Sequence, residues 1–305
     1  MGYGGYSYSS ASSRSMAYKT SAKSDYTYLD REVFSRRSLD KDMDIKGKIR
    51  ESRDSAEHPE AFSCALFTDT TGSMGGIPKH LITQGYPELM KKIMDAGVKH
   101  LQVCFGGVGD NECDSAPIQV GEFETNDELQ EKWLKSIYLE GGGGSNPGEG
   151  YALAWYTAAR HMVTDSMQKR GQKGVLITIG DEPYLPKISK RDLNDLFGGA
   201  QSDITAAEAF TEASKNWDIY HINVKDYRGS RDDVQTQWKQ LLGDHFVNTQ
   251  TSDGTDIPDI IADIVIKCYK ERGNKGQLLT ENEKPDVAEV VQPKSETEKN
   301  NEHLL

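Results

Sequence analysis

Oxygen-bearing side chains stand at alternate positions in the segment DTTGS. Asp69, Thr71 and Ser73 offer one carboxylate and two hydroxyls at positions i, i+2 and i+4. On a tight turn these oxygens can converge on one point, and hard cations such as Mg²⁺ and Mn²⁺ prefer oxygen ligands. The segment therefore indicates a divalent-cation site. The simpler alternative is a strand-to-helix turn in which the same side chains cap amide groups.

Asp181 occupies a comparable position further along the chain. The apolar run 61–68 (AFSCALFT) predicts a buried strand that ends at Asp69, and the run 175–179 (VLITI) predicts another that ends just before Asp181. Ligands of parallel sheets bind beyond the carboxyl ends of the strands. We therefore expect both aspartates at the same edge of one sheet.

Strands and helices alternate through the middle of the chain. The predicted strands are 61–68, 100–106, 117–123, 175–179, 219–224 and 245–248. The loop between the second and third is short enough for an antiparallel pair. Helix starts are predicted at the capping boxes Thr125/Glu128, Ser189/Asp192 and Thr205/Glu208. The alternation predicts an α/β fold with a doubly wound, mostly parallel open sheet that helices cover on both faces.

The DTTGS segment matches a known signature. Asp69, Thr71 and Ser73 fit the pattern D-x-[ST]-x-S of the metal-ion-dependent adhesion site in von Willebrand factor A-type domains, and the segment resembles the form common in microbial members. The resemblance covers the central part of the chain. It implies a Rossmann-like fold and a bound Mg²⁺ or Mn²⁺ ion.

The same resemblance implies two further metal loops. The second loop precedes the helix that starts near Tyr151 and reads GGGGSNPGEG; the family usually has Thr there and sometimes Asp. In this chain Ser145 is the favoured ligand and Asn146 the alternative. The third loop should carry an acidic residue after the fourth strand, where Asp181 stands. The implied ligands are Asp69, Thr71, Ser73, Ser145 or Asn146, and Asp181.

The two ends of the chain have a different composition. Residues 1–57 are rich in Ser, Tyr and Gly and then in charged residues, and residues 273–305 are polar; both lack periodic apolar positions. Such segments cannot bury enough apolar surface to offset their ordering entropy. We therefore expect a disordered arm and a disordered tail around a single domain at 58–272.

Composition limits the classes of partner and the compartment. A net charge of -12 over 305 residues disfavours binding to nucleic acid and to anionic membranes. We find no signal peptide and no run near the about 20 apolar residues that span a membrane. Cys64, Cys104 and Cys268 lie in apolar runs and are interpreted as reduced core residues. These features predict a soluble cytoplasmic protein.

An acidic loop follows the second predicted strand. Asp110, Glu112 and Asp114 are interpreted as a solvated loop that tunes the field near the metal, with a second cation as the less favoured alternative. Isolated histidines and tryptophans are interpreted as core or surface residues rather than ligands: His80, His161, His221, Trp155 and Trp238.

Three functions are compatible with these features. The leading hypothesis is a non-enzymatic, cation-dependent binding module, because the family resemblance implies an ion completed by the carboxylate of a partner protein such as an ATPase or an assembly component. The second is a Mg²⁺-dependent phosphatase-like hydrolase with Asp69 as nucleophile, although Thr71 stands where the general acid is usual. The third is a structural protein that self-associates through its N-terminal arm.

Overall fold

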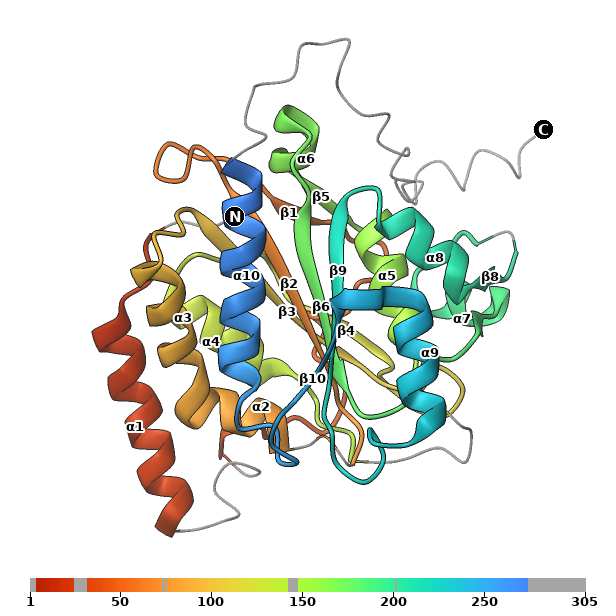
Figure 1. Ribbon diagram of the computed structural model, residues 1–305, viewed down its shortest axis with the longest axis horizontal. Helices are drawn as coiled ribbons and strands as arrows, with labels where there is room; N and C mark the ends of the chain where they lie inside the picture. Colours follow the sequence, from red (N-terminus) through yellow and green to blue (C-terminus); the bar gives the residue numbers. More distant parts are fainter. Residues whose placement is uncertain are drawn as a thin grey trace, which may run out of the picture.

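The centre of the molecule is a six-stranded sheet. The computed structural model describes residues 4–24, 32–72, 74, 76–141, 148–200 and 202–273. The strands follow the order β10-β9-β6-β2-β3-β4, and all neighbours are parallel except the antiparallel pair β3–β4 (Figure 1). Their bounds are β2 Phe62–Asp69, β3 Leu101–Val108, β4 Ile118–Val120, β6 Gly174–Gly180, β9 Trp217–Asn223 and β10 Phe246–Asn248. The predicted fold class is confirmed.

Strand β2 lies in the middle of this sheet and is buried along its whole length. Alternate side chains of a strand point to opposite faces, so β2 contributes to two separate cores. Cys64 and Leu66 belong to the core on one face, whereas Ala65 and Phe67 belong to the core on the other. This burial on both faces explains the unbroken apolar run in the sequence.

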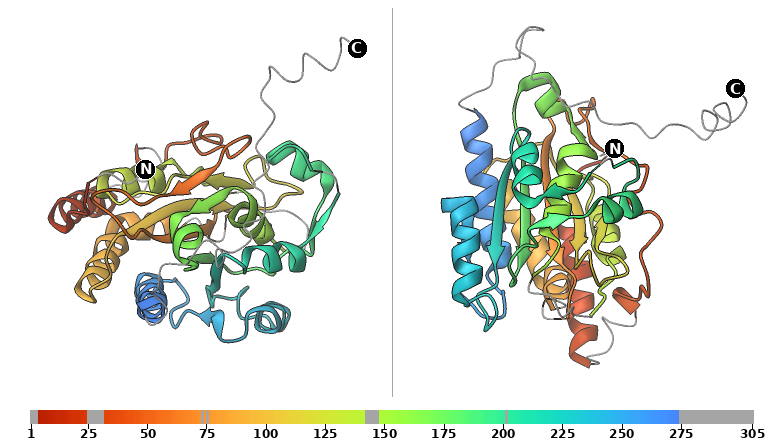
Figure 2. Two further views of the ribbon diagram at one scale, coloured as in Figure 1. Left: turned by 90° about the horizontal axis from the view of Figure 1, so that it is seen from above. Right: turned by 90° about the vertical axis from the view of Figure 1, so that its right-hand side faces the viewer.

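Helices cover both faces of the sheet (Figure 2). One face carries α2 Gly76–His80, the π-helical turn η2 Leu81–Gly85, α3 Tyr86–Asp95, α4 Asp127–Ser136 and α10 Ile257–Gly273. The other carries α5 Tyr151–Arg160, α7 Lys190–Leu196, α8 Ala206–Ala213 and α9 Asp232–Leu242. The remaining elements are α6 Asp165–Arg170, the turn η3 Gly243–His245 and the short strand pair β7 Lys187–Ile188 with β8 Ile204–Thr205. None of the described helices is long and apolar enough to cross a membrane.

The start of α4 differs from its prediction. Asn126, not Thr125, is the N-cap, and its side chain accepts hydrogen bonds from the amides of Glu128 and Leu129. The Thr125 hydroxyl instead donates to the Gly4 carbonyl, a contact that no local pattern reveals. The helix starts predicted at Ser189 and Thr205 are confirmed, because each side-chain oxygen accepts the amide three residues later.

The prediction of a disordered arm at 1–57 is wrong for the described part of that segment. Helix α1, Tyr8–Ser24, packs outside α3 and contacts η2 and α4 (red in Figure 1). Arg14 bridges it to α4, with guanidinium nitrogens 2.6 Å from Asp127 Oδ2 and 2.5 Å from Glu131 Oε2. The helix is held by these polar contacts and by Ala11, Tyr18 and Ala22, whose limited apolar packing does not form a continuous apolar stripe that the sequence could show.

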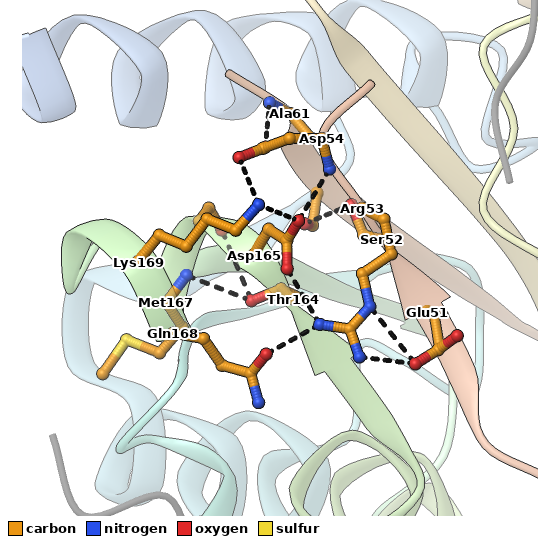
Figure 3. Close-up of polar contacts among 12 residues, drawn as sticks. Glu51, Ser52, Arg53, Asp54, Ala61, Thr164, Asp165, Met167, Gln168 and Lys169 are labelled. Atoms are coloured by element: carbon orange, nitrogen blue, oxygen red, sulfur yellow. Dashed lines mark hydrogen bonds and ion pairs between the residues drawn. The ribbon is translucent and has the colours of Figure 1, made fainter. Parts of the chain in front are cut away.

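A second part of the predicted arm adds a strand pair to the domain. Strand β1, Arg50–Ser52, pairs in parallel with β5, Met162–Thr164. Beyond β1, Arg53 donates to Asp165 Oδ1 at 2.8 Å and to Gln168 Oε1 at 2.7 Å, and Asp54 accepts from Lys169 (Figure 3). The predicted boundary at residue 58 is therefore too late. Helix α10 ends at Gly273, and the rest of the predicted tail lies outside the described residues.

The cysteine prediction is confirmed for the core positions. Cys64, Cys104 and Cys268 are buried free thiols, and Cys113 is an exposed one. Burial raises the pKa of the Cys268 thiol to about 11, so the thiol stays protonated near neutral pH.

Candidate metal centre

Asp69 is the last residue of β2 and is fully buried. Its Oδ1 accepts the Thr71 amide at 2.8 Å and the Thr71 hydroxyl at 2.7 Å. Its Oδ2 accepts the Tyr151 hydroxyl at 3.1 Å. These contacts fix the direction of the carboxylate at the start of the loop that the sequence marked as a metal loop.

Asp181 follows β6, the strand next to β2, and is also fully buried. The two strands run parallel, with Thr68 opposite Ile179. Asp69 and Asp181 therefore lie at the same edge of the sheet, as the sequence predicted. The predicted ligands Ser73, Ser145 and Asn146 lie outside the described residues.

Tyr151 donates a hydrogen bond to Asp69 and was not predicted as a site residue. It is the first residue of α5 and is fully buried. Burial, together with the negative charges of Asp69 and Asp181, holds the pKa of its hydroxyl well above the usual value. A Cβ at Gly180 would lie 1.7 Å from this hydroxyl, so the glycine before Asp181 provides the space that Tyr151 occupies.

Glu149 is the second site residue that sequence reasoning missed. Its amide donates to the Pro183 carbonyl at 2.8 Å, and the next amide, of Gly150, donates to the Gly109 carbonyl at 3.1 Å. Gly109 follows β3 and Pro183 follows β6, the two strands that flank β2. These two bonds hold the Glu149 backbone between the loops that flank the end of β2, where Asp69 lies.

The acidic loop after β3 contributes a buried carboxylate as well. Asp110 is fully buried, so the prediction of a solvated loop is wrong for this residue; Glu112 is exposed as expected. Asp110 Oδ1 accepts the Glu112 amide at 2.8 Å, and Asp114 Oδ2 accepts the Asp110 amide at 2.8 Å. These bonds turn the loop inward at the same edge of the sheet.

Three carboxylates of this edge, those of Asp69, Asp110 and Glu149, form no ion pair in the described part of the chain. No described lysine or arginine forms an ion pair with Asp69, Asp110 or Glu149, whereas Glu182 pairs with Arg228 and Arg231 at 3.0 Å each. Burial raises the pKa of Asp69 to about 6.

For Glu149, burial and then the charge of Asp69 raise the pKa to about 10. Buried carboxylates are normally paired or coordinate a metal, so the donor set fits a divalent cation.

Carboxylates alone do not form a complete cage. Within the described ranges, no three Asp, Glu, His or Cys side chains are placed so that they could hold an ion by themselves. A hard cation readily takes hydroxyls and waters as its remaining ligands. The arrangement therefore suits a mixed set in which carboxylates from β2 and β6 are joined by hydroxyl groups of the loops.

The open, mostly parallel sheet and the two aspartates at one edge agree with the resemblance seen in the sequence. The fold is von Willebrand factor A-like in outline. No family model matches the chain, and no curated protein matches it.

Several solved structures are similar to the chain. The pilus adhesin SpaC from Lactobacillus rhamnosus GG has 10% identity and a TM-score of 0.46 over 73% of this chain and 31% of that one. A von Willebrand factor type A protein from Catenulispora acidiphila has 11% identity and a TM-score of 0.40 over 69% of this chain and 43% of that one.

BatB from Bacteroides thetaiotaomicron has 14% identity and a TM-score of 0.38 over 69% of this chain and 100% of that one. This chain thus spans about a third of the adhesin's length.

Proposed function

We propose that this protein is a non-enzymatic binding module whose Mg²⁺ or Mn²⁺ ion is completed by a carboxylate of a partner protein. Asp69, Thr71 and Asp181, together with Ser73 and either Ser145 or Asn146, would hold the ion. Two carboxylates balance its formal charge. The neutral hydroxyls leave the ion able to attract a further acidic ligand.

The observation that carries this proposal is that the Asp69 carboxylate is fully buried without a described cationic side chain beside it. A fully buried carboxylate normally has a cationic partner, whereas the described hydrogen-bond donors to Asp69 are neutral groups of Thr71 and Tyr151. A divalent cation would supply the missing charge at the edge where the Asp181 carboxylate also lies.

The described contacts also support the role of Thr71. Its hydroxyl lies 2.7 Å from Asp69 Oδ1, so the two oxygens are close enough to bind one ion. A hydroxyl retains a lone pair for an ion while it donates to a carboxylate. Thr71 can therefore orient Asp69 and bind the ion at the same time.

A capture experiment tests this function. The full chain, immobilised, is exposed to cell extract in Mg²⁺ and in chelator, beside the variant Asp69→Asn. We expect a partner that is retained only by the unaltered chain in Mg²⁺, and whose binding is lost when one of its acidic residues is neutralised. Equal capture of that partner in chelator would show that the metal mechanism is wrong.

A further inference from the structure

Two buried carboxylate oxygens at the metal edge have no hydrogen-bond partner among the described residues: Asp110 Oδ2 and Glu149 Oε2. Asp110 is fully buried, and only 6% of the Glu149 surface is exposed. Unpaired polar atoms of this kind are rare in folded proteins, and each one needs a physical reason.

The backbone brings these two side chains to one place. The hydrogen bond from the Gly150 amide to the Gly109 carbonyl, 3.1 Å long, joins the residue after Glu149 to the residue before Asp110. Both side chains are buried next to this bond. The two loops therefore bring the buried residues Asp110 and Glu149 close together at this edge of the sheet.

We propose that Asp110 and Glu149 hold a second divalent cation beside the ion at Asp69. This inference rests on the proposed function, because the two ions would share one pocket at the sheet edge. The first ion balances Asp69 and Asp181, and it leaves the charges of Asp110 and Glu149 uncompensated. A second divalent cation balances this pair in turn.

Protonation explains the pair less well than a cation does. A protonated Glu149 would be neutral, but its buried Oε2 has no hydrogen-bond partner among the described residues, so protonation alone would leave this atom unsatisfied. Asp110 would keep its unpaired Oδ2 as well. A cation satisfies both oxygens with one ligand.

The chemistry of the pair suits hard cations that keep water. Two carboxylate oxygens supply part of a shell, and Mg²⁺, Mn²⁺ and Ca²⁺ complete such shells with waters and carbonyl oxygens. The Asp114 side chain is half-buried in the same loop and binds the Asp110 amide, which fixes the position of Asp110.

The test is a count of Mn²⁺ ions per chain by equilibrium dialysis on the full protein near neutral pH. We expect two ions for the unaltered chain and one for Glu149→Gln and for Asp110→Asn. Glutamine has the shape of a protonated Glu149, so this variant should fold even if the carboxyl is neutral. Glu112→Gln removes the same charge from an exposed site of the acidic loop and should keep both ions.

The outcomes separate this inference from the proposed function. If the unaltered chain binds one ion and Glu149→Gln also binds one, the second site is wrong and the first site stands. If the unaltered chain binds one ion and Glu149→Gln binds none, the second site is also wrong, because Glu149 then belongs to the first site. No ion in the unaltered chain would overturn both proposals.

Discussion

Asp69 and Tyr151 illustrate how one buried residue can orient the carboxylate that we propose as a metal ligand. The Tyr151 hydroxyl donates to Asp69 Oδ2 at 3.1 Å and leaves Oδ1 to the Thr71 hydroxyl. Groups that orient ligands in this way usually contribute strongly to metal affinity. The sequence placed Tyr151 only near the start of a helix, because nothing local indicates that its hydroxyl reaches β2.

Removing that hydroxyl should weaken metal binding. We expect Tyr151→Phe to lower the affinity for Mn²⁺ by about 10-fold or more, because the Asp69 carboxylate loses one of its orienting donors. Calorimetric titration measures the change. Tyr184→Phe is the matched control, since the Tyr184 ring packs on Trp155 and Trp238, whereas the donor to Asp69 Oδ2 is Tyr151. Equal affinities for both variants would contradict the orienting role.

His221 provides a prediction on pH dependence. It is fully buried, its ring stacks on Trp238 at 3.6 Å, and its Nδ1 lies 2.8 Å from the Thr178 hydroxyl. Burial holds its pKa well below the usual value of 6.5. The unfolded chain therefore takes up a proton below pH 6.5 that the folded chain does not, so His221 makes the fold less stable as the pH falls.

His221→Phe should remove this part of the acid sensitivity. Between pH 7 and pH 5 we expect the free energy of unfolding of the unaltered chain to fall more steeply than that of the variant. Urea unfolding at several pH values gives the two curves. If the curves stay parallel, His221 is not a source of acid sensitivity.

Among the elements, the central strands were the easiest to predict and α1 the hardest. β2 and β6 are buried on both faces, so their sequences show continuous apolar runs. In α1, only Ala11 and Ser15 are buried among residues with described side chains, and the helix is fixed by charges on a distant helix. Local composition cannot reveal a contact that depends on tertiary structure.

Arg14 is the residue that should hold α1 in place. Arg14→Ala removes the partner of Asp127 and Glu131, whose side chains are only 5% and 13% exposed. We expect a loss of about 1–3 kcal/mol in the free energy of unfolding, and faster amide hydrogen exchange in α1.

Arg191→Ala is the matched control for this variant. Arg191 and Asp195 are both exposed, and the two charged groups are 3.7 Å apart. Arg191→Ala should lower the free energy of unfolding by no more than about 0.5 kcal/mol. Unchanged hydrogen exchange of α1 in Arg14→Ala would show that other contacts hold the helix.

For the whole molecule, the sheet edge is where separate parts of the sequence meet. Asp69 and Asp181 were predictable because strand ends are visible in the sequence. Glu149 was not, because its position depends on backbone hydrogen bonds to the loops after β3 and β6. Its place directly before the helix at Tyr151, inside the expected second metal loop, was the one signal available.

The most direct test measures the unfolding of the full chain with and without Mg²⁺, beside Asp69→Asn. A ligand that binds only the folded state stabilises it by about 2.7 kcal/mol when its free concentration is 100 times its Kd. We predict a saturable gain in stability for the unaltered chain and a clearly smaller gain for the variant. No gain in the unaltered chain, or an equal gain in both, would contradict a divalent cation at Asp69.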